Sequence, residues 1–307
     1  MTIKRRLPFL FVILIGSCDL PDERSSNATE EQSSEQEDQW IKEIKDFGKK
    51  ALSEGEKLTS DTYKKLKEIQ INGFSVEDDI QMGQQLYDEI QSSPEYEVLS
   101  ESEYSSLYAY VEKIKNTILK NGHLKYKDVF EWKITILKDD KTVNAFCAPG
   151  GFIFIYTGIL KYLDNEAELA GVLAHEMGHA ERRHGTRQLT KSMGIQMVLD
   201  YLMDGERSKY FKEVINGLIG LRYSRSYERE ADECSVKFLC NTSYKADGAA
   251  GFFEKIITEQ GERSVELLST HPDPEERIEK FHSFKKQCNC KGANTYSDNY
   301  EIMKDQL

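Results

Sequence analysis

Residues 175–179 read His-Glu-Met-Gly-His, and this stretch decides how the rest of the chain is interpreted. His175 and His179 are four residues apart, so on a helix their imidazoles leave the same face and can meet on one metal ion. Zinc peptide hydrolysis needs two neutral imidazoles, an open coordination position and a carboxylate that takes a proton from water. The stretch therefore predicts His175 and His179 as zinc ligands and Glu176 as the general base.

The residues before this motif favour a helix. Residues 166–174 read Glu-Ala-Glu-Leu-Ala-Gly-Val-Leu-Ala, which is a good helix-forming run, and Asp164 or Asn165 can cap its start. The four-residue spacing of the two histidines is therefore read on a helix. The alternative is that two unrelated histidines lie on a packed helix.

A second helix supplies candidates for the third ligand. Residues 227–234 read Tyr-Glu-Arg-Glu-Ala-Asp-Glu-Cys and precede an apolar-periodic stretch. Glu228 and Asp232 share one helical face, so Glu228 can ligate the metal while Asp232 accepts the N–H of a ligating histidine. Glu230 lies roughly 200° from Glu228 on the helical wheel and is the poorer candidate. The alternative is a solvated acidic helix face.

Four motifs in order resemble peptidase family M48. Residues 144–151 resemble the family's Asn-Ala-Phe-Ala-x-Pro-Gly-Gly strand, with Cys147 where alanine is common. Residues 175–179, 223–228 and 270–278 resemble its zinc helix, its approach to the third ligand and its Thr-His-Pro segment. The resemblance implies an α+β, mainly helical, zincin-like (gluzincin) peptidase domain over residues 76–287, with a small β-sheet beside the zinc-binding helix.

The resemblance also implies one Zn²⁺ per chain on the same three ligands, with the same general base and the same supporting aspartate. It adds His271, which in some periplasmic relatives lies on a loop over the zinc and occupies the fourth position. The alternative for His271 is a surface turn residue, because His-Pro-Asp-Pro is rich in turn formers. Tyr223, Arg225 and His271 are all candidates for stabilising the oxyanion.

The N-terminus predicts a secreted, lipid-anchored protein. Residues 1–17 combine a basic start with a short apolar run, and Gly16-Ser17-Cys18 resembles a bacterial lipobox in which Cys18 is lipidated. Residues 18–39 carry eight acidic residues against one arginine, which predicts a disordered tether. We therefore expect the chain on the periplasmic side of the bacterial cell envelope, held to a membrane through the lipid alone. The alternative is an ordinary signal peptide.

The remaining chain reads as mostly helical. Residues 40–75 predict an N-terminal helical segment, helices follow at about 76–91 and 101–120, and residues 288–307 form a polar tail. Residues 132–137 and 152–156 predict strands, and an edge strand there could hold an extended peptide by main-chain pairing. The net charge of −12 comes with no basic patch, which argues against a nucleic-acid partner.

Lipidation of Cys18 would leave five other cysteines, so at least one stays free or pairs between molecules. An oxidising envelope favours a disulfide from the tail to Cys240 or Cys234. A metal site in the tail is the alternative, although Cys288-Asn-Cys290 has the wrong spacing for a zinc pair.

These features together predict a zinc metalloendopeptidase that degrades misfolded or unassembled envelope proteins. Two alternatives belong to other functional classes. One is a catalytically latent envelope chaperone or assembly factor that retains the peptidase fold. The other is a lipid-anchored binding protein with a structural metal.

Overall fold

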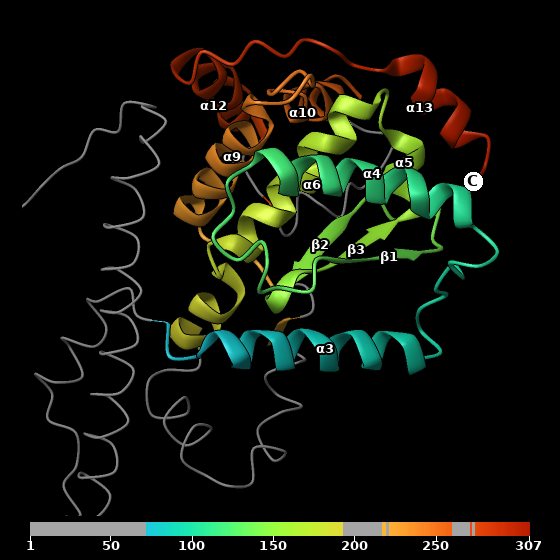
Figure 1. Cartoon of the computed structure of the whole chain (residues 1–307), viewed down its shortest axis with the longest axis vertical. Helices are drawn as coiled ribbons and strands as arrows, with labels where there is room; N and C mark the ends of the chain where they lie inside the picture. The colour runs from blue at the N-terminus through green and yellow to red at the C-terminus, as the bar shows by residue number, and fades with distance from the viewer. Residues whose placement is uncertain (1–71, 193–216, 219–220, 260–270, 272–273) are drawn as a thin grey trace, which may run out of the picture.

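A three-stranded sheet lies at the centre of the molecule (Figure 1), with the strand order β1-β3-β2. The strands are β1 (Lys133–Leu137), β2 (Ala145–Ala148) and β3 (Phe152–Tyr156). β1 pairs parallel to β3, while β2 pairs antiparallel to it, and the strands predicted at 132–137 and 152–156 are confirmed. β2 therefore lies at one edge, and within the described part of the chain β3 is its only partner strand.

This computed structural model describes residues 72–192, 217–218, 221–259, 271 and 274–307. The predicted signal peptide, Cys18, the tether and nearly all of the 40–75 segment lie outside the described residues. The predicted α+β, mainly helical fold is confirmed. The helices are α3 (Val76–Ser92), α4 (Ser105–Asn121), α5 (Thr157–Tyr162), α6 (Glu166–Glu181), α9 (Arg225–Cys240), α10 (Ala249–Thr258), α12 (Pro274–Gln287) and α13 (Ser297–Lys304).

A tight connection joins β2 to β3 through the short 3₁₀ turn η1 (Pro149–Gly151). Gly150 and Gly151 have φ angles of 73° and 85°, a left-handed conformation that costs glycine little. The Pro-Gly-Gly sequence thus allows the tight reversal that sets β2 antiparallel to β3.

β3 is apolar on both faces because helices cover both sides of the sheet. Phe152 and Phe154 point into one core cluster, which α3 shares through Met82, Leu86 and Ile90. Ile153 and Ile155 belong to the larger cluster on the other face, built with residues of α4, α6, α9 and α10. Alternate side chains of one strand therefore connect the two layers.

α6 is the central helix, and its start and its packing follow from its sequence. Asn165 rather than Asp164 caps it, by accepting a hydrogen bond from the backbone N–H of Glu168. In the C-terminal half of α6, a Cβ added to Gly178 would lie 3.0 Å from the Cβ of Cys234 on α9. Glycine at this position lets α9 pack directly on α6, which brings the first turn of α9 to the histidines.

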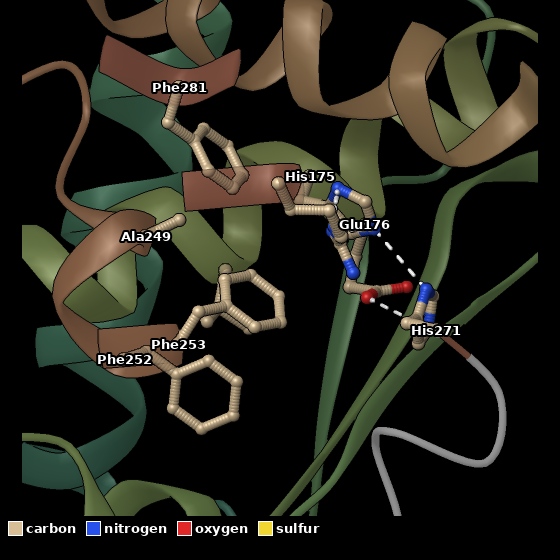
Figure 2. Close-up of a pocket in the computed structure, with 9 residues that line it drawn as sticks. His175, Glu176, Ala249, Phe252, Phe253, His271 and Phe281 are labelled. Carbon is tan, nitrogen blue, oxygen red and sulfur yellow. Dashed lines mark hydrogen bonds and ion pairs between the residues drawn. The ribbon is translucent and has the colours of Figure 1, made fainter. Parts of the chain in front are cut away.

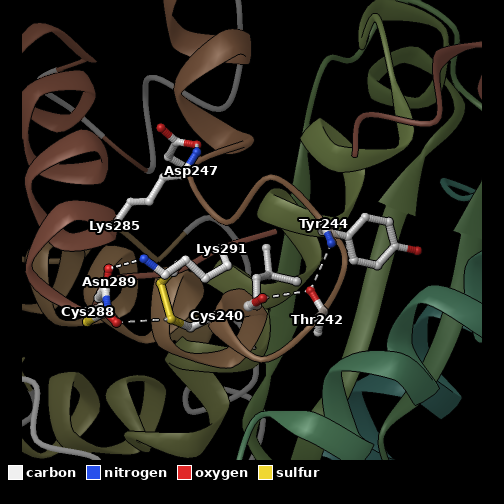
Figure 3. Close-up of a disulfide and its surroundings, with 10 residues drawn as sticks. Cys240, Thr242, Tyr244, Asp247, Lys285, Cys288, Asn289 and Lys291 are labelled. Atoms are coloured by element: carbon white, nitrogen blue, oxygen red, sulfur yellow. Dashed lines mark hydrogen bonds and ion pairs between the residues drawn. A yellow bond between two sulfur atoms is a disulfide. The ribbon is translucent and has the colours of Figure 1, made fainter. Parts of the chain in front are cut away.

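The C-terminal segment is polar in sequence, yet it packs firmly on the domain. Tyr300 and Met303 of α13 are fully buried, and the Tyr300 hydroxyl donates to the carbonyl of Leu160. A disulfide joins Cys240, at the end of α9, to Cys290 (Figure 3), which confirms the predicted tail disulfide and decides its partner as Cys240 and not Cys234. Among the described cysteines, Cys147 and Cys234 are free thiols and buried.

No helix in the described ranges combines the length and the apolar character needed to cross a bilayer.

Candidate metal centre

Four buried side chains converge at the meeting point of α6 and α9. His175 and His179 come from α6, Glu228 from the first turn of α9, and His271 from the segment just before α12. One potential ligand atom from each residue lies within 4.8 Å of all the others. The predicted ligands are thus brought together across 96 residues of sequence, the separation between His175 and His271.

The spacing of these atoms fits a tetrahedral zinc ion. Bonds of about 2.1 Å would place neighbouring ligand atoms about 3.4 Å apart. His175 Nε2 lies 3.0 Å from His179 Nε2 and 3.3 Å from His271 Nδ1. Glu228 oxygens lie 3.0 Å from His271 Nδ1, 3.5 Å from His175 Nε2 and 3.6 Å from His179 Nε2. The group is able to hold one metal ion, and a set of imidazoles with one carboxylate suits zinc.

Asp232 and Arg277 lie directly behind the donor set. Asp232 Oδ1 is 3.0 Å from His175 Nδ1, on the side of the ring opposite the ligand atoms. Arg277 of α12 donates from Nε to Asp232 Oδ2 over 2.9 Å and from Nη2 to Oδ1 over 2.5 Å. Its Nη1 lies 3.2 Å from Glu228 Oε2, so one buried guanidinium faces both carboxylates. This contact ties α12 to the metal centre.

Glu176 lies between His271 and an apolar wall (Figure 2). The wall contains Phe252, Phe253 and Phe281 and encloses a cavity of about 10 Å³, room for about one water. Glu176 Oε1 is buried and has no hydrogen-bond partner among the described residues, and His271 Nε2 lies 3.7 Å from it. A carboxylate oxygen with an unused lone pair therefore stands beside the donor set.

The buried charges set the protonation states of the site. Burial raises the pKa of Glu176, as expected beside an apolar wall. Burial also acts on Glu228, but the neighbouring His271 and His175 hold the pKa of that carboxyl well below its usual value. Burial and the nearby His175 push the pKa of His179 well below its ordinary value. An anionic Glu228 and a neutral His179 are the forms that ligate a metal.

The pKa of His175 is shifted in the opposite direction from that of His179. Burial and Arg277 act to lower the pKa of His175, yet hydrogen bonds to Asp232 and Glu228 raise it to about 9. A metal ion that binds here must therefore displace a proton.

A cleft of about 410 Å³, lined by Phe146 and Cys147 of β2 and by Tyr156 of β3, reaches His271. Phe146 and Tyr156 contribute aromatic side chains to its walls. Its charged lining is mostly acidic, with Glu95, Glu97 and Asp139 against Lys138. Asn144 also lines the cleft; the residue is 7% exposed, and its Oδ1 has no hydrogen-bond partner among the described residues.

The oxyanion candidates are placed differently. The Tyr223 ring stacks on His179 with centroids 4.0 Å apart, and Tyr223 lines the cleft. Arg225 is exposed and lines a separate cavity of about 300 Å³ between α9 and α12. His271 is only 1% exposed, so the alternative of a surface turn residue is wrong.

Three residues around the site had no assigned role from the sequence. Arg277 lies in the Thr-His-Pro motif, but the residues next to it in the sequence do not indicate a contact with α9. Asn144 stands in the strand motif, whose side chains cannot be assigned to a cleft without the fold. His184 lies five residues after His179 and contacts it through a turn outside the helical period. The residue spacing therefore could not identify these contacts.

Comparison with known proteins gives a consistent result. The model of Peptidase family M48 matches residues 105–285, more than half of the chain. The chain is 31% identical to mitochondrial metalloendopeptidase OMA1 of Arabidopsis thaliana over 48% of the chain and 30% of that protein. It is 29% identical to metalloprotease YcaL of Escherichia coli over 45% and 56%. It is 27% identical to the beta-barrel assembly-enhancing protease of Escherichia coli over 46% and 32%. The chain thus spans less than two thirds of each of these relatives.

Proposed function

The chain belongs to peptidase family M48, and from this premise we propose that it is a zinc-dependent endopeptidase of the bacterial cell envelope. We propose misfolded or unassembled envelope proteins as its substrates. The observation that carries the proposal is the buried donor set of His175, His179 and Glu228 beside the unpartnered oxygen of Glu176. A purely structural zinc site would have no use for a free carboxylate oxygen beside its ligands.

Each side chain of the site has a role in this chemistry. Bound zinc would polarise the scissile carbonyl and acidify the attacking water. Glu176 Oε1 takes a proton from that water and returns it to the nitrogen of the leaving amine. Asp232 accepts the Nδ1–H of His175, which leaves Nε2 available as a ligand. Arg277 compensates the negative charge that Asp232 and Glu228 bring into the interior.

The cleft beside β2 supports an extended polypeptide as the substrate. An edge strand offers main-chain donors and acceptors that pair with any sequence, which suits proteins recognised by their unfolded state. Asn144 Oδ1 is a buried acceptor that a substrate N–H could satisfy. The aromatic walls and acidic rim of the cleft favour apolar or basic side chains over acidic ones.

The position of His271 favours a resting state with low activity. Its Nδ1 lies 3.0 Å from both Glu228 oxygens and 3.3 Å from His175 Nε2, where a fourth ligand would stand. An imidazole there would exclude the attacking water until the segment moves. This feature also supports the second candidate, a latent assembly factor that retains the peptidase fold.

The envelope location and the lipid anchor rest on different observations. The resemblance of residues 14–18 to a lipobox supports lipidation of Cys18. The disulfide between Cys240 and Cys290 suits an oxidising compartment. The name of one relative refers to enhancement of β-barrel assembly, which also suits an envelope setting.

The decisive experiment compares the purified chain with Glu176→Gln and Glu228→Ala. Zinc content is measured by elemental analysis and proteolysis with an unfolded model protein as substrate. We expect one zinc per wild-type chain, retained zinc but about 10²- to 10⁴-fold slower cleavage for Glu176→Gln, and lost zinc for Glu228→Ala. Cleavage by Glu176→Gln at the wild-type rate would contradict the proposed mechanism.

A further inference from the structure

The two histidines of α6 are supported in different ways. His175 is backed by the carboxylate of Asp232, whereas the Nδ1 atom of His179 faces a third imidazole, that of His184, over 3.0 Å. His184 is fully buried, and its Nε2 lies 3.1 Å from Glu230 Oε2. We propose that Glu230 and His184 form a hydrogen-bonded chain that positions His179 as a metal ligand; this inference rests on the zinc site proposed above.

The positions of the ring nitrogens determine which nitrogens of His179 and His184 carry a proton. His179 Nε2 faces His175 and Glu228, so a metal ion held there requires Nε2 to be unprotonated and places the proton on Nδ1. His184 Nδ1 must then accept that proton in a hydrogen bond. The remaining proton of a neutral His184 lies on Nε2, from which it is donated to Glu230. The reverse arrangement would protonate the ligand atom of His179 and block metal binding.

The backbone holds His184 in this place against the helical period. α6 ends at Glu181, and Arg183 adopts a φ of 54°, which is uncommon for a residue other than glycine. This turn brings His184 back to the histidine five positions earlier. The ring of Tyr227 stacks on the His184 ring, with centroids 4.4 Å apart and planes at 12°. His184 is therefore held from the backbone and from α9 together.

Two cations hold Glu230 at the outer end of this hydrogen-bonded chain. Arg182 Nε and Arg187 Nη1 each lie 3.5 Å from a Glu230 oxygen. A carboxylate at this position makes His184 a better acceptor, and through it strengthens His179 as a donor to the metal. Glu230 points away from Glu228 on the helical wheel and is therefore no direct ligand. It contacts His184 instead, and His184 contacts the ligand His179.

The competing interpretation is that His184 is a packed core residue whose polar atoms merely happen to be satisfied. The two interpretations differ in metal affinity rather than in fold stability. His184→Leu removes the acceptor for His179, while His184→Asn keeps an acceptor oxygen near the position of Nδ1 but loses the link to Glu230. Glu230→Gln removes the negative charge at the outer end of the hydrogen-bonded chain. Glu233→Gln removes a carboxylate on the same helix that pairs with Lys237, and serves as the matched control.

The experiment measures zinc affinity by competition with a chromophoric chelator and the absorption spectrum of the Co²⁺-loaded chain. Circular dichroism and thermal unfolding of the metal-free variants report on the fold. We expect His184→Leu to weaken zinc binding about 10- to 100-fold and to change the Co²⁺ spectrum. We expect His184→Asn to retain more affinity than His184→Leu, and Glu230→Gln to bind more weakly than Glu233→Gln.

Unchanged zinc affinity in a folded His184→Leu chain would overturn the inference. Equal losses in His184→Leu and His184→Asn would do the same, because the acceptor atom would then be irrelevant. If His184→Leu does not fold, the comparison of Glu230→Gln with Glu233→Gln decides, and equal affinities overturn the inference. A wild-type chain that binds no zinc would instead overturn the proposed function itself.

Discussion

Replacing Arg277 with methionine should destabilise the metal-free chain by about 3–5 kcal/mol, the usual cost of removing one partner from a buried ion pair. Arg277 is 5% exposed, and the two carboxylates that it faces, Asp232 and Glu228, are 1% and 3% exposed. Methionine keeps an unbranched apolar side chain, which preserves part of the packing against Phe253, whose ring centroid lies 4.3 Å from the guanidinium carbon. The loss therefore reports mainly on charge.

The size of this loss of stability follows from the buried carboxylates that remain after the substitution. Burial alone would raise the pKa of Asp232, and the charge of Arg277 is the largest influence that holds it below its ordinary value. Without the guanidinium, Asp232 loses hydrogen bonds of 2.9 and 2.5 Å. Asp232 then keeps only the His175 imidazole, 3.0 Å away, as its cationic partner, and the loss of the guanidinium charge beside two buried carboxylates costs folding free energy.

The assay is urea unfolding in the presence of a chelator, so that metal binding does not contribute. Arg277→Met, Asp232→Asn and the double variant form a cycle with the wild type. Because an amide at position 232 needs no counter-charge, Arg277→Met should cost less in the Asp232→Asn background, with a coupling free energy of about 0.5–3 kcal/mol. A loss below about 1 kcal/mol, or strictly additive losses, would refute this account of Arg277.

Three other predictions concern separate parts of the chain. His271→Ala should raise basal cleavage of an unfolded substrate if His271 holds the fourth position, whereas a decrease would assign it to the oxyanion and no change would leave it without a catalytic role. Cys290→Ser should lower the free energy of unfolding by up to about 4 kcal/mol, the chain-entropy value for the 50-residue separation from Cys240; equal urea midpoints of this variant and the oxidised wild type would contradict it. Mass spectrometry of the mature N-terminus should find lipidated Cys18, and an unmodified N-terminal residue other than Cys18 would disprove the anchor.

Local spacing allowed much of the site to be predicted from the sequence. Four-residue spacing on a helix is a geometric constraint, so His175 and His179 share a face wherever the helix packs, and Glu228 and Asp232 do the same. The strands around the Pro-Gly-Gly turn follow from β-branched and aromatic residues bounded by glycine, which is also a short-range signal. The polar composition of the tail, by contrast, concealed the buried Tyr300 and Met303 of α13.

Only the tertiary structure decided which distant groups meet. His271 approaches His175 across 96 residues, and Arg277 reaches Asp232 across 45, because α12 packs against α9 and not because of any periodicity. His184 contacts His179 through the left-handed turn at Arg183, which breaks the helical period on which sequence reasoning depends. The sequence by itself determined the chemical identity of the donors and the face from which each projects. Their convergence depends on the close packing of α6 and α9 at Gly178, which is set by side-chain volumes across two helices.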